Sequence, residues 1–183
     1  MRASQLMTKN VASCSPSDSL EQAARLMWEW DVGCVVVVVD RQKPVGIITD
    51  RDLAMAAYTR GAPLRDISVE SAMSSLLWSC SVNTSLAEIE IKMQTAQVRR
   101  VPVVGFDGEL VGIVTLADIA RSAYSNPLHL VELPGLARTL ANITERRWGK
   151  SAPALRLVPP TEIKLDAADA SAVAAWRNEG DPN

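Results

Sequence analysis

The sequence predicts an α/β (α+β) fold built from two copies of one small β-α-β-β-α unit. A Gly-hydrophobic-hydrophobic-Thr-x-x-Asp segment occurs twice, at residues 46–52 and 112–118, with an offset of 66 residues. The same offset aligns residues 6–58 with residues 72–124 without a gap. Both copies also show the same order of strand-like and helix-like periodicity. These features together indicate an internal repeat.

Each copy is expected to begin with an extended segment and a helix. The extended segments are predicted at residues 11–13 and 77–79. The polar residues 17–19 and 83–85 follow, and their side-chain oxygens can cap the first backbone N–H groups of a helix. Apolar residues then recur at helical spacing. The two helices are expected to end near Trp30 and Ala96.

Two strands and a second helix complete each copy. The β-branched runs at residues 35–39 and 101–104 are almost wholly apolar, which is typical of strands covered on both faces. A polar turn leads to each partner strand, and a helix begins directly after the threonine. One copy alone would leave a sheet face uncovered, so the two copies are expected to pack around a pseudo-two-fold axis. The expected partner strands are residues 45–48 and 110–114.

The chain divides by sequence into repeat one (1–62), repeat two (63–125) and a C-terminal extension (126–183). The extension is expected to dock on the repeats, on a partner chain or on another protein. Its predicted elements are a helix over residues 136–143, a short strand over 161–164 and an Ala-rich helix over 169–177.

Composition narrows the function classes. The formal net charge is −2, so no general attraction to nucleic acid is indicated. The longest apolar run, residues 34–39, is too short to cross a bilayer, and no secretory signal is evident. The three cysteines form no C-x-x-C pair, and the single histidine, His129, has no partner at metal-ligand spacing. We therefore expect a cytoplasmic protein without a metal site and without a nucleic-acid or membrane partner.

The repeated Thr-x-x-Asp turns carry the functional hypothesis. Thr49 and Thr115 stand where a strand ends and a helix begins, a place whose unpaired N–H groups and dipole favour anions. Asp52 and Asp118 follow on the same side of the first turn, where a carboxylate can accept hydrogen bonds from the vicinal hydroxyls of a ribose. The alternative is a capping box that only stabilises each helix. Recurrence of the turn after the same glycine strand favours binding.

Two such repeats resemble a tandem of CBS domains (cystathionine-β-synthase-type domains), a pair called a Bateman module. The resemblance covers residues 4–125 and is most specific in the Gly-h-h-Thr-x-x-Asp segments. It implies a β-α-β-β-α repeat and a regulatory rather than catalytic role. It also implies an adenosine-type ligand (AMP, ADP, ATP, NAD or S-adenosylmethionine) bound between the repeats, and frequent assembly into a disc-like homodimer.

The resemblance also implies two clefts, each with one aspartate on the ribose and one threonine on ribose or phosphate. The expected stronger site consists of Leu77, Trp78, Val98, Arg99, Arg100, Pro102, Thr115, Asp118 and Arg51. The expected weaker site consists of Val11, Ala12, Val32, Gly33, Thr49 and Asp52.

Charge makes the two clefts unequal. In the family, basic residues at the positions of Arg100 and Arg51 can reach phosphate, and both are assigned to the Asp118 cleft. An arginine pair on phosphate can be bidentate and strong. Gly33 and Ala117 take the equivalent places in the other cleft and add no cation. Trp78 replaces the small residue common in the family; it could stack on the base, crowd the pocket or simply pack between the repeats.

Two competing functions stay open. The first is a structural or interaction protein that kept this fold and lost the ligand. The second is an enzyme, but the sequence contains no phosphate-binding loop, no nucleophile elbow and no zinc-protease motif. No catalytic residue is therefore expected, and an unknown regulated protein is expected as the partner.

Overall fold

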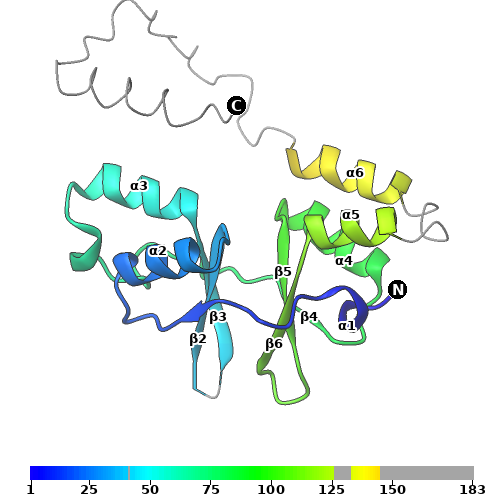
Figure 1. Cartoon of the computed structure of the whole chain (residues 1–183), viewed down its shortest axis with the longest axis horizontal. Coiled ribbons are helices and arrows are strands. Elements are labelled where there is room, and N and C mark those ends of the chain that lie inside the picture. The colour runs from blue at the N-terminus through cyan, green and yellow to red at the C-terminus, as the bar shows by residue number, and fades with distance from the viewer. Residues whose placement is uncertain (41, 126–132, 145–183) are drawn as a thin grey trace, which may run out of the picture. The chain divides into compact units, whose positions relative to one another are not determined.

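The computed structural model describes residues 1–40, 42–125 and 133–144, and these contain two three-stranded sheets of equivalent design (Figure 1). The first sheet and its helices belong to repeat one. Its elements are β1 (Ser13–Cys14), α2 (Leu20–Glu29), β2 (Cys34–Val39), β3 (Lys43–Thr49) and α3 (Asp50–Arg60).

Repeat two contains the same elements in the same order, which confirms the predicted β-α-β-β-α unit. Both predicted N-caps are present: Ser19 accepts the N–H of Gln22, and Ser85 accepts the N–H of Glu88. The elements of repeat two are β4 (Cys80–Ser81), α4 (Leu86–Ala96), β5 (Arg100–Val104), β6 (Leu110–Thr115) and α5 (Leu116–Ser125).

The two sheets share strand order and register. In each, the short first strand is parallel to the central strand, and the third strand is antiparallel to it. Val36 pairs with Ile47 in repeat one, and Pro102 pairs with Ile113 at the equivalent place in repeat two. Both central strands also carry a register shift at the same position. The duplication in sequence is therefore a duplication in structure.

The first strand of each repeat begins two or three residues later than predicted. The sequence placed extended segments at residues 11–13 and 77–79, whereas the strands are β1 and β4. Pairing begins only where the backbone runs alongside the central strand, at Ser13 opposite Val36. Val11 and Ala12 lie before this ladder, although the carbonyl of Ala12 accepts the N–H of Val36 at 3.0 Å. Ala12 packs in the core of repeat one, and Val11 packs on the cluster of Cys34, Val36 and Ile113 that joins the repeats.

Each repeat has its own apolar core, and a third cluster joins them. Fully buried residues such as Leu20 and Val35 fill the first core, and Ile89 and Val101 fill the second. The joining cluster packs residues of β2, chiefly Cys34 and Val36, against Ile113 of β6. The uncovered sheet faces are buried against each other, as the sequence predicts.

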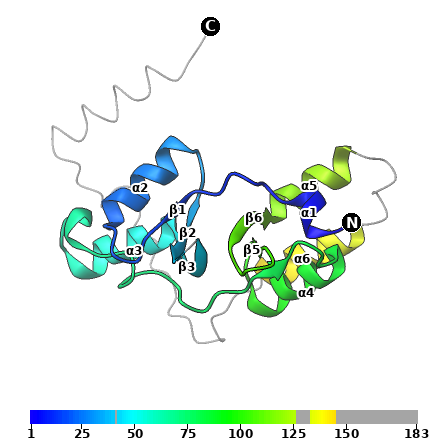
Figure 2. The same cartoon turned by 90° about the horizontal axis from the view of Figure 1, so that it is seen from below.

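Residues 1–8, here called the N-terminal arm, pack on repeat two rather than on repeat one. The arm contains a short helix, α1 (Ala3–Leu6), which the sequence analysis did not predict and which lies beside α5 (Figures 1 and 2). Leu86 donates its N–H to the carbonyl of Met1, and Thr8 pairs with Ile113 of β6. A Cβ on Gly112 would lie 2.5 Å from the sulfur of Met7, so this glycine makes room for the arm.

Residues 67–74, the inter-repeat arm, make on repeat one the contacts that the N-terminal arm makes on repeat two. They follow a 3₁₀ turn, η1 (Leu64–Asp66). Leu20 donates its N–H to the carbonyl of Ile67 at 2.8 Å, and Ser74 pairs with Ile47. A Cβ on Gly46 would lie 2.6 Å from the sulfur of Met73. The glycine of each repeated motif therefore admits an arm methionine.

The first helix of the extension, α6 (Leu133–Thr144), packs on α4 and α5 of repeat two. It confirms the helix predicted at residues 136–143. Gln94 donates to the hydroxyl of the buried Thr139 at 2.8 Å and accepts from Asn142 at 3.1 Å, and Ile143 enters the second core. The strand and helix predicted at residues 161–164 and 169–177 lie outside the described residues.

Candidate functional site

The Thr-x-x-Asp turn of repeat two is a reciprocal cap at the start of α5. The N–H and the hydroxyl of Thr115 donate to Oδ2 of Asp118 at 2.8 and 2.6 Å. The N–H of Asp118 donates back to the threonine hydroxyl at 3.2 Å. Thr49 and Asp52 make the same three contacts at 2.9, 2.7 and 3.4 Å. Both turns thus have the capping role, and both hold a carboxylate in a fixed orientation.

The second carboxylate oxygen distinguishes the two turns. Oδ1 of Asp118 accepts Nη2 of Arg121 at 2.5 Å and the hydroxyl of Thr8, on the N-terminal arm, at 3.4 Å. Asp118 is 8% exposed, whereas the Arg121 side chain is 70% exposed. In α3 the residue equivalent to Arg121 is Met55. The repeat-two carboxylate is therefore buried and paired with a cation, whereas no described residue pairs with its counterpart Asp52 in this way.

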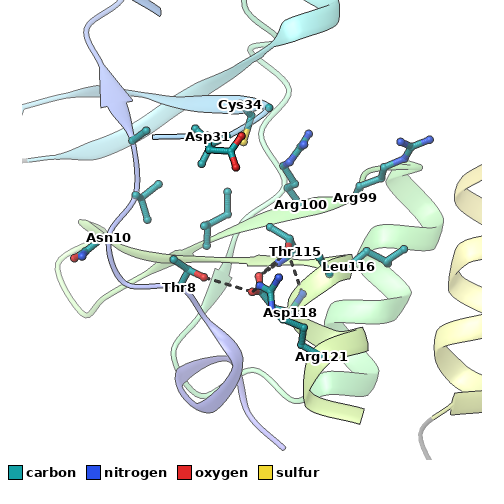
Figure 3. A pocket seen from close by; sticks show the side chains of 16 residues that line it. Thr8, Asn10, Asp31, Cys34, Arg99, Arg100, Thr115, Leu116, Asp118 and Arg121 are labelled. Atoms are coloured by element: carbon teal, nitrogen blue, oxygen red, sulfur yellow. Dashed lines mark hydrogen bonds and ion pairs between the residues drawn. The ribbon is translucent and has the colours of Figure 1, made fainter. Parts of the chain in front are cut away.

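A cavity of about 420 Å³ opens at Asp118 and is lined by both repeats (Figure 3). In Figure 3, Asp31 and Cys34 of repeat one lie across the cavity from Asp118. The predicted weaker-site residues in the wall are Val11, Ala12, Val32 and Gly33. The predicted stronger-site residues in the wall are Arg99, Arg100, Thr115 and Asp118.

The structure groups these residues differently from the sequence prediction, which assigned each wall to the aspartate of its own repeat. Asp118 instead faces Val11 and Val32, because β2 packs against β6 and the N-terminal arm runs onto repeat two. The pseudo-two-fold relation correspondingly assigns the wall containing Trp78 to Asp52. The predicted residues outside the Asp118 cavity are Leu77, Trp78, Val98, Pro102, Arg51, Thr49 and Asp52.

Packing explains several of these positions. Pro102 is buried within β5, where it pairs with Ile113, and Val98 packs on the core of repeat two. Leu77 and Trp78 are half-buried on the segment that leads to β4. Arg51 is exposed at the start of α3 and does not reach the cavity at Asp118.

The structure adds residues that the sequence analysis missed. Arg121 could have been found, because a residue three positions after Asp118 lies on the same face of a helix. No local signal marks Thr8, which reaches the site only because its arm crosses to repeat two. The other missed wall residues are Asn10, Asp31, Cys34, Ile113 and Leu116. Ala117, which the sequence analysis assigned to the Asp52 cleft, lies in the wall of the Asp118 cavity instead.

Charge and space around Gly33 suit an anionic ligand. Arg99, Arg100 and Arg121 line the cavity together with Asp31 and Asp118, although the side chain of Arg99 points away from it in Figure 3. The carboxylate of Asp50 also lies near Gly33, 3.3 Å from the place of a Cβ. A Cβ on Gly33 would lie 2.9 Å from Nη2 of Arg100. The missing side chain at this position therefore leaves room for the guanidinium in the wall.

Cys34 is the one thiol in the wall of this cavity, and burial disfavours its reactive thiolate form. Burial raises the pKa of the Cys34 thiol, and this outweighs the opposing effect of Arg100. A protonated thiol is a poor nucleophile. Among the described residues, no group of three or more His, Cys, Asp or Glu side chains could hold a metal ion. The described part of the chain also has no helix long and apolar enough to cross a membrane.

The fold and the cavity define a pair of repeats with one ligand-sized cleft at their junction. The family model for the CBS domain matches the chain twice, over residues 3–58 and 65–125. The chain therefore belongs to the CBS domain family and contains a tandem pair of these domains.

Named relatives support the assignment. The chain is 38% identical over 122 residues to the CBS domain-containing protein YhcV of Bacillus subtilis, covering 66% of this chain and 84% of YhcV. The crystal structure of CBSX2 in complex with AMP matches with a TM-score of 0.59 at 27% identity, covering 68% and 96%. The CBS domain pair of protein MJ0100, crystallised with 5′-methylthioadenosine and S-adenosyl-L-methionine, matches with a TM-score of 0.62 at 25% identity, covering 68% and 97%.

Proposed function

We propose that the Asp118 cavity binds an adenosine-type ligand, and that the chain acts as a ligand-sensing regulator and not as an enzyme. The observation that carries the proposal is a buried carboxylate, oriented by Thr115, in a cavity of ligand size lined by both repeats. Small-molecule pockets combine apolar walls with convergent polar groups, and this cavity contains both.

Each part of the ligand has a matching part of the wall. Oδ2 of Asp118 is held by Thr115, so a ribose hydroxyl would donate to Oδ1, the oxygen that accepts Arg121 in the structure. The base would lie against the apolar side chains of Val11, Val32 and Ile113. Arg99 and Arg100 would bind phosphate, because guanidinium groups pair with phosphate through two parallel hydrogen bonds.

The neighbours support the ligand class without naming the ligand of this chain. CBSX2 was crystallised with AMP, and the MJ0100 pair with two adenosine-containing compounds. AMP, ADP, ATP, NAD and S-adenosylmethionine all offer the same ribose to Asp118. The arginines of the wall make this the stronger of the two proposed sites, with the Asp52 turn as the weaker.

Regulation would follow from the position of the cavity. Its wall includes Thr8 of the N-terminal arm and residues of both repeats, so an occupant contacts three separately packed segments. A ligand shifts a conformational equilibrium only by its difference in affinity between the two states. A ligand that contacts both repeats would have different contacts when the repeats are arranged differently, and so would bind the two arrangements with different affinity. We further propose a cytoplasmic homodimer whose geometry is sensed by a separate regulated protein.

The test is nucleotide binding to the full chain by isothermal titration calorimetry, with native mass spectrometry of the purified protein. Asp118→Asn keeps the shape and removes the charge, and it should weaken AMP binding by about tenfold or more, since hydrogen bonds to charged groups contribute roughly 1.5–3 kcal/mol. Asp52→Asn is the matched comparison and should have the smaller effect. Unchanged AMP affinity in Asp118→Asn together with lost affinity in Asp52→Asn would contradict the proposal.

One observation favours the alternative, a protein that kept the fold and serves interaction alone. Oδ1 of Asp118 already has an internal partner in Arg121, as a purely structural carboxylate would. Large aromatic residues are also exposed, including Trp28 at 88% and Tyr58 at 84%. This alternative predicts that no nucleotide copurifies and that none of the five candidate ligands raises the melting temperature.

A further inference from the structure

The contact between Arg121 and Asp118 occupies the atom that the proposed ligand needs. Arg121 donates to Oδ1 of Asp118 at 2.5 Å, and Thr8 approaches the same oxygen at 3.4 Å. Oδ2 is already taken by two donors from Thr115. A ribose diol must therefore displace Arg121 or share its acceptor.

Displacement is easy for Arg121 and costly for Asp118. The Arg121 side chain is 70% exposed and can extend into water, whereas that of Asp118 is 7% exposed and would lose its cation. A buried carboxylate that exchanges a guanidinium for neutral hydroxyl donors loses the stronger kind of hydrogen bond. A ligand is therefore favoured when it offers Arg121 a new anionic partner near its original place.

We propose that Arg121 is a latch that selects phosphorylated ligands: it blocks the ribose acceptor of the empty cavity and moves to the phosphate of the bound ligand. This inference rests on the proposed function, because it concerns the same cavity. A nucleoside monophosphate supplies both the diol that takes Oδ1 and the anion that takes the guanidinium. Adenosine supplies the diol alone and leaves Arg121 without its partner.

The wall of the cavity contains further arginines that could share a phosphate with Arg121. Arg99 and Arg100 line the same cavity as Arg121, and the α5 N-terminus adds a favourable dipole. A guanidinium can donate two parallel hydrogen bonds to a phosphate. A phosphate can therefore replace the contact that Arg121 gives up at Asp118. Arg121 lies one turn beyond Asp118 on α5 and can reach either group from one backbone position.

Repeat one shows what the turn is like without the latch. Met55 takes the place of Arg121 in α3, and Asp52 has the same contacts with Thr49. Arg121→Met therefore gives the Asp118 turn the chemistry that the chain itself uses in its other repeat. The replaced side chain is mostly exposed, so little packing is lost, but the buried Asp118 loses its cation, and the fold of the variant is therefore checked by circular dichroism.

The experiment measures the affinities of AMP and adenosine for the full chain by calorimetry, in the wild type and in Arg121→Met. The ratio of AMP affinity to adenosine affinity should fall by about tenfold in the variant, with adenosine binding more tightly than in the wild type. Adenosine affinity that is unchanged or weaker in the variant would overturn the latch. Arg121→Gln serves as a second variant and should give the same shift if the methionine variant misfolds.

Two further variants distinguish a failure of the latch from a failure of the proposed function. Arg25→Met removes an exposed arginine of α2 that does not line the cavity, and it should leave the affinity ratio at its wild-type value. Asp118→Asn should weaken both ligands. If Asp118→Asn weakens both but Arg121→Met keeps the ratio, the latch alone is wrong. If Asp118→Asn changes neither affinity, the proposed function fails as well.

Discussion

The two Thr-x-x-Asp turns are alike in their hydrogen bonds and different in their surroundings. Thr49 and Thr115 hold Oδ2 of Asp52 and Asp118 in the same way, within 0.1 Å for the two bonds that each threonine donates. Within the described part of the chain, only Asp118 has a cation on its other oxygen. The comparison teaches that the local motif orients a carboxylate, and that the next turn of helix and the opposite repeat decide what the carboxylate meets.

The helices α2 and α4, which are equivalent in the two repeats, also differ in their surroundings. Position 94 of α4 is a glutamine whose side chain bonds Thr139 and Asn142 of α6. The equivalent position of α2 is Trp28, which is 88% exposed. One face is covered by the chain itself, and the other is presented to solvent with a large aromatic side chain. The repeats are thus duplicates in their cores and not in their surfaces.

The largest expected effect on stability is the difference between substitutions at Gln94 of α4 and at Trp28 of α2. Gln94→Ala leaves the buried Thr139 hydroxyl and the Asn142 amide without their partner, and should lower the free energy of unfolding by about 2 kcal/mol. Trp28→Ala at the equivalent position should change it by less than about 0.5 kcal/mol. Urea denaturation of both variants measures the difference. Equal losses at the two positions would mean that α6 does not stabilise repeat two.

A smaller effect is expected from the two capping threonines. Thr115→Ala and Thr49→Ala each remove a cap and should cost about 1 kcal/mol. The loss should be larger at Thr115, because the more buried Asp118 would lose a donor. Thr115→Ser and Thr49→Ser keep the hydroxyl and serve as matched controls in the same denaturation experiment. A larger loss at Thr49 would contradict this ranking.

The smallest expected effect is a difference in alkylation rate between Cys14 and Cys80, which take equivalent positions in the two repeats. Burial, followed by the nearby Asp18, raises the pKa of Cys14 from 9.0 to about 11. Burial also raises the pKa of Cys80, but Lys92 and a hydrogen bond from Thr84 oppose it. Since the thiolate is the reactive form, iodoacetamide at pH 9 should alkylate Cys80 faster than Cys14. Mass spectrometry of the two tryptic peptides gives the rates, and faster alkylation of Cys14 would contradict the order.

The same shift predicts how Cys14 affects stability at high pH. The folded protein keeps the Cys14 proton to a higher pH than the unfolded chain does, because the folded-state pKa is the higher one. The stabilisation is therefore complete below about pH 9 and is lost as pH rises toward 11. Cys14→Ala should show a weaker fall of unfolding free energy across this range than the wild type.

Much of the fold could be predicted because its signals are local. The offset of 66 residues, the polar caps before α2 and α4, and the β-branched runs of β2 and β5 all appear within short windows of sequence. The prediction failed where no local signal exists. The strands β1 and β4 begin only where they meet a neighbouring strand, and α1 is stabilised by contacts with repeat two.

The sequence by itself determined that this chain contains two CBS-type repeats, each ending in a carboxylate oriented by a threonine. These features depend on side chains that lie within a few positions of one another. Only the tertiary structure decided which walls face which aspartate, because the N-terminal arm runs onto repeat two and there brings Thr8 to Ile113 and Asp118. The pairing of Arg121 with Asp118 likewise depends on side-chain rotamers and burial, which spacing along a helix permits but does not choose.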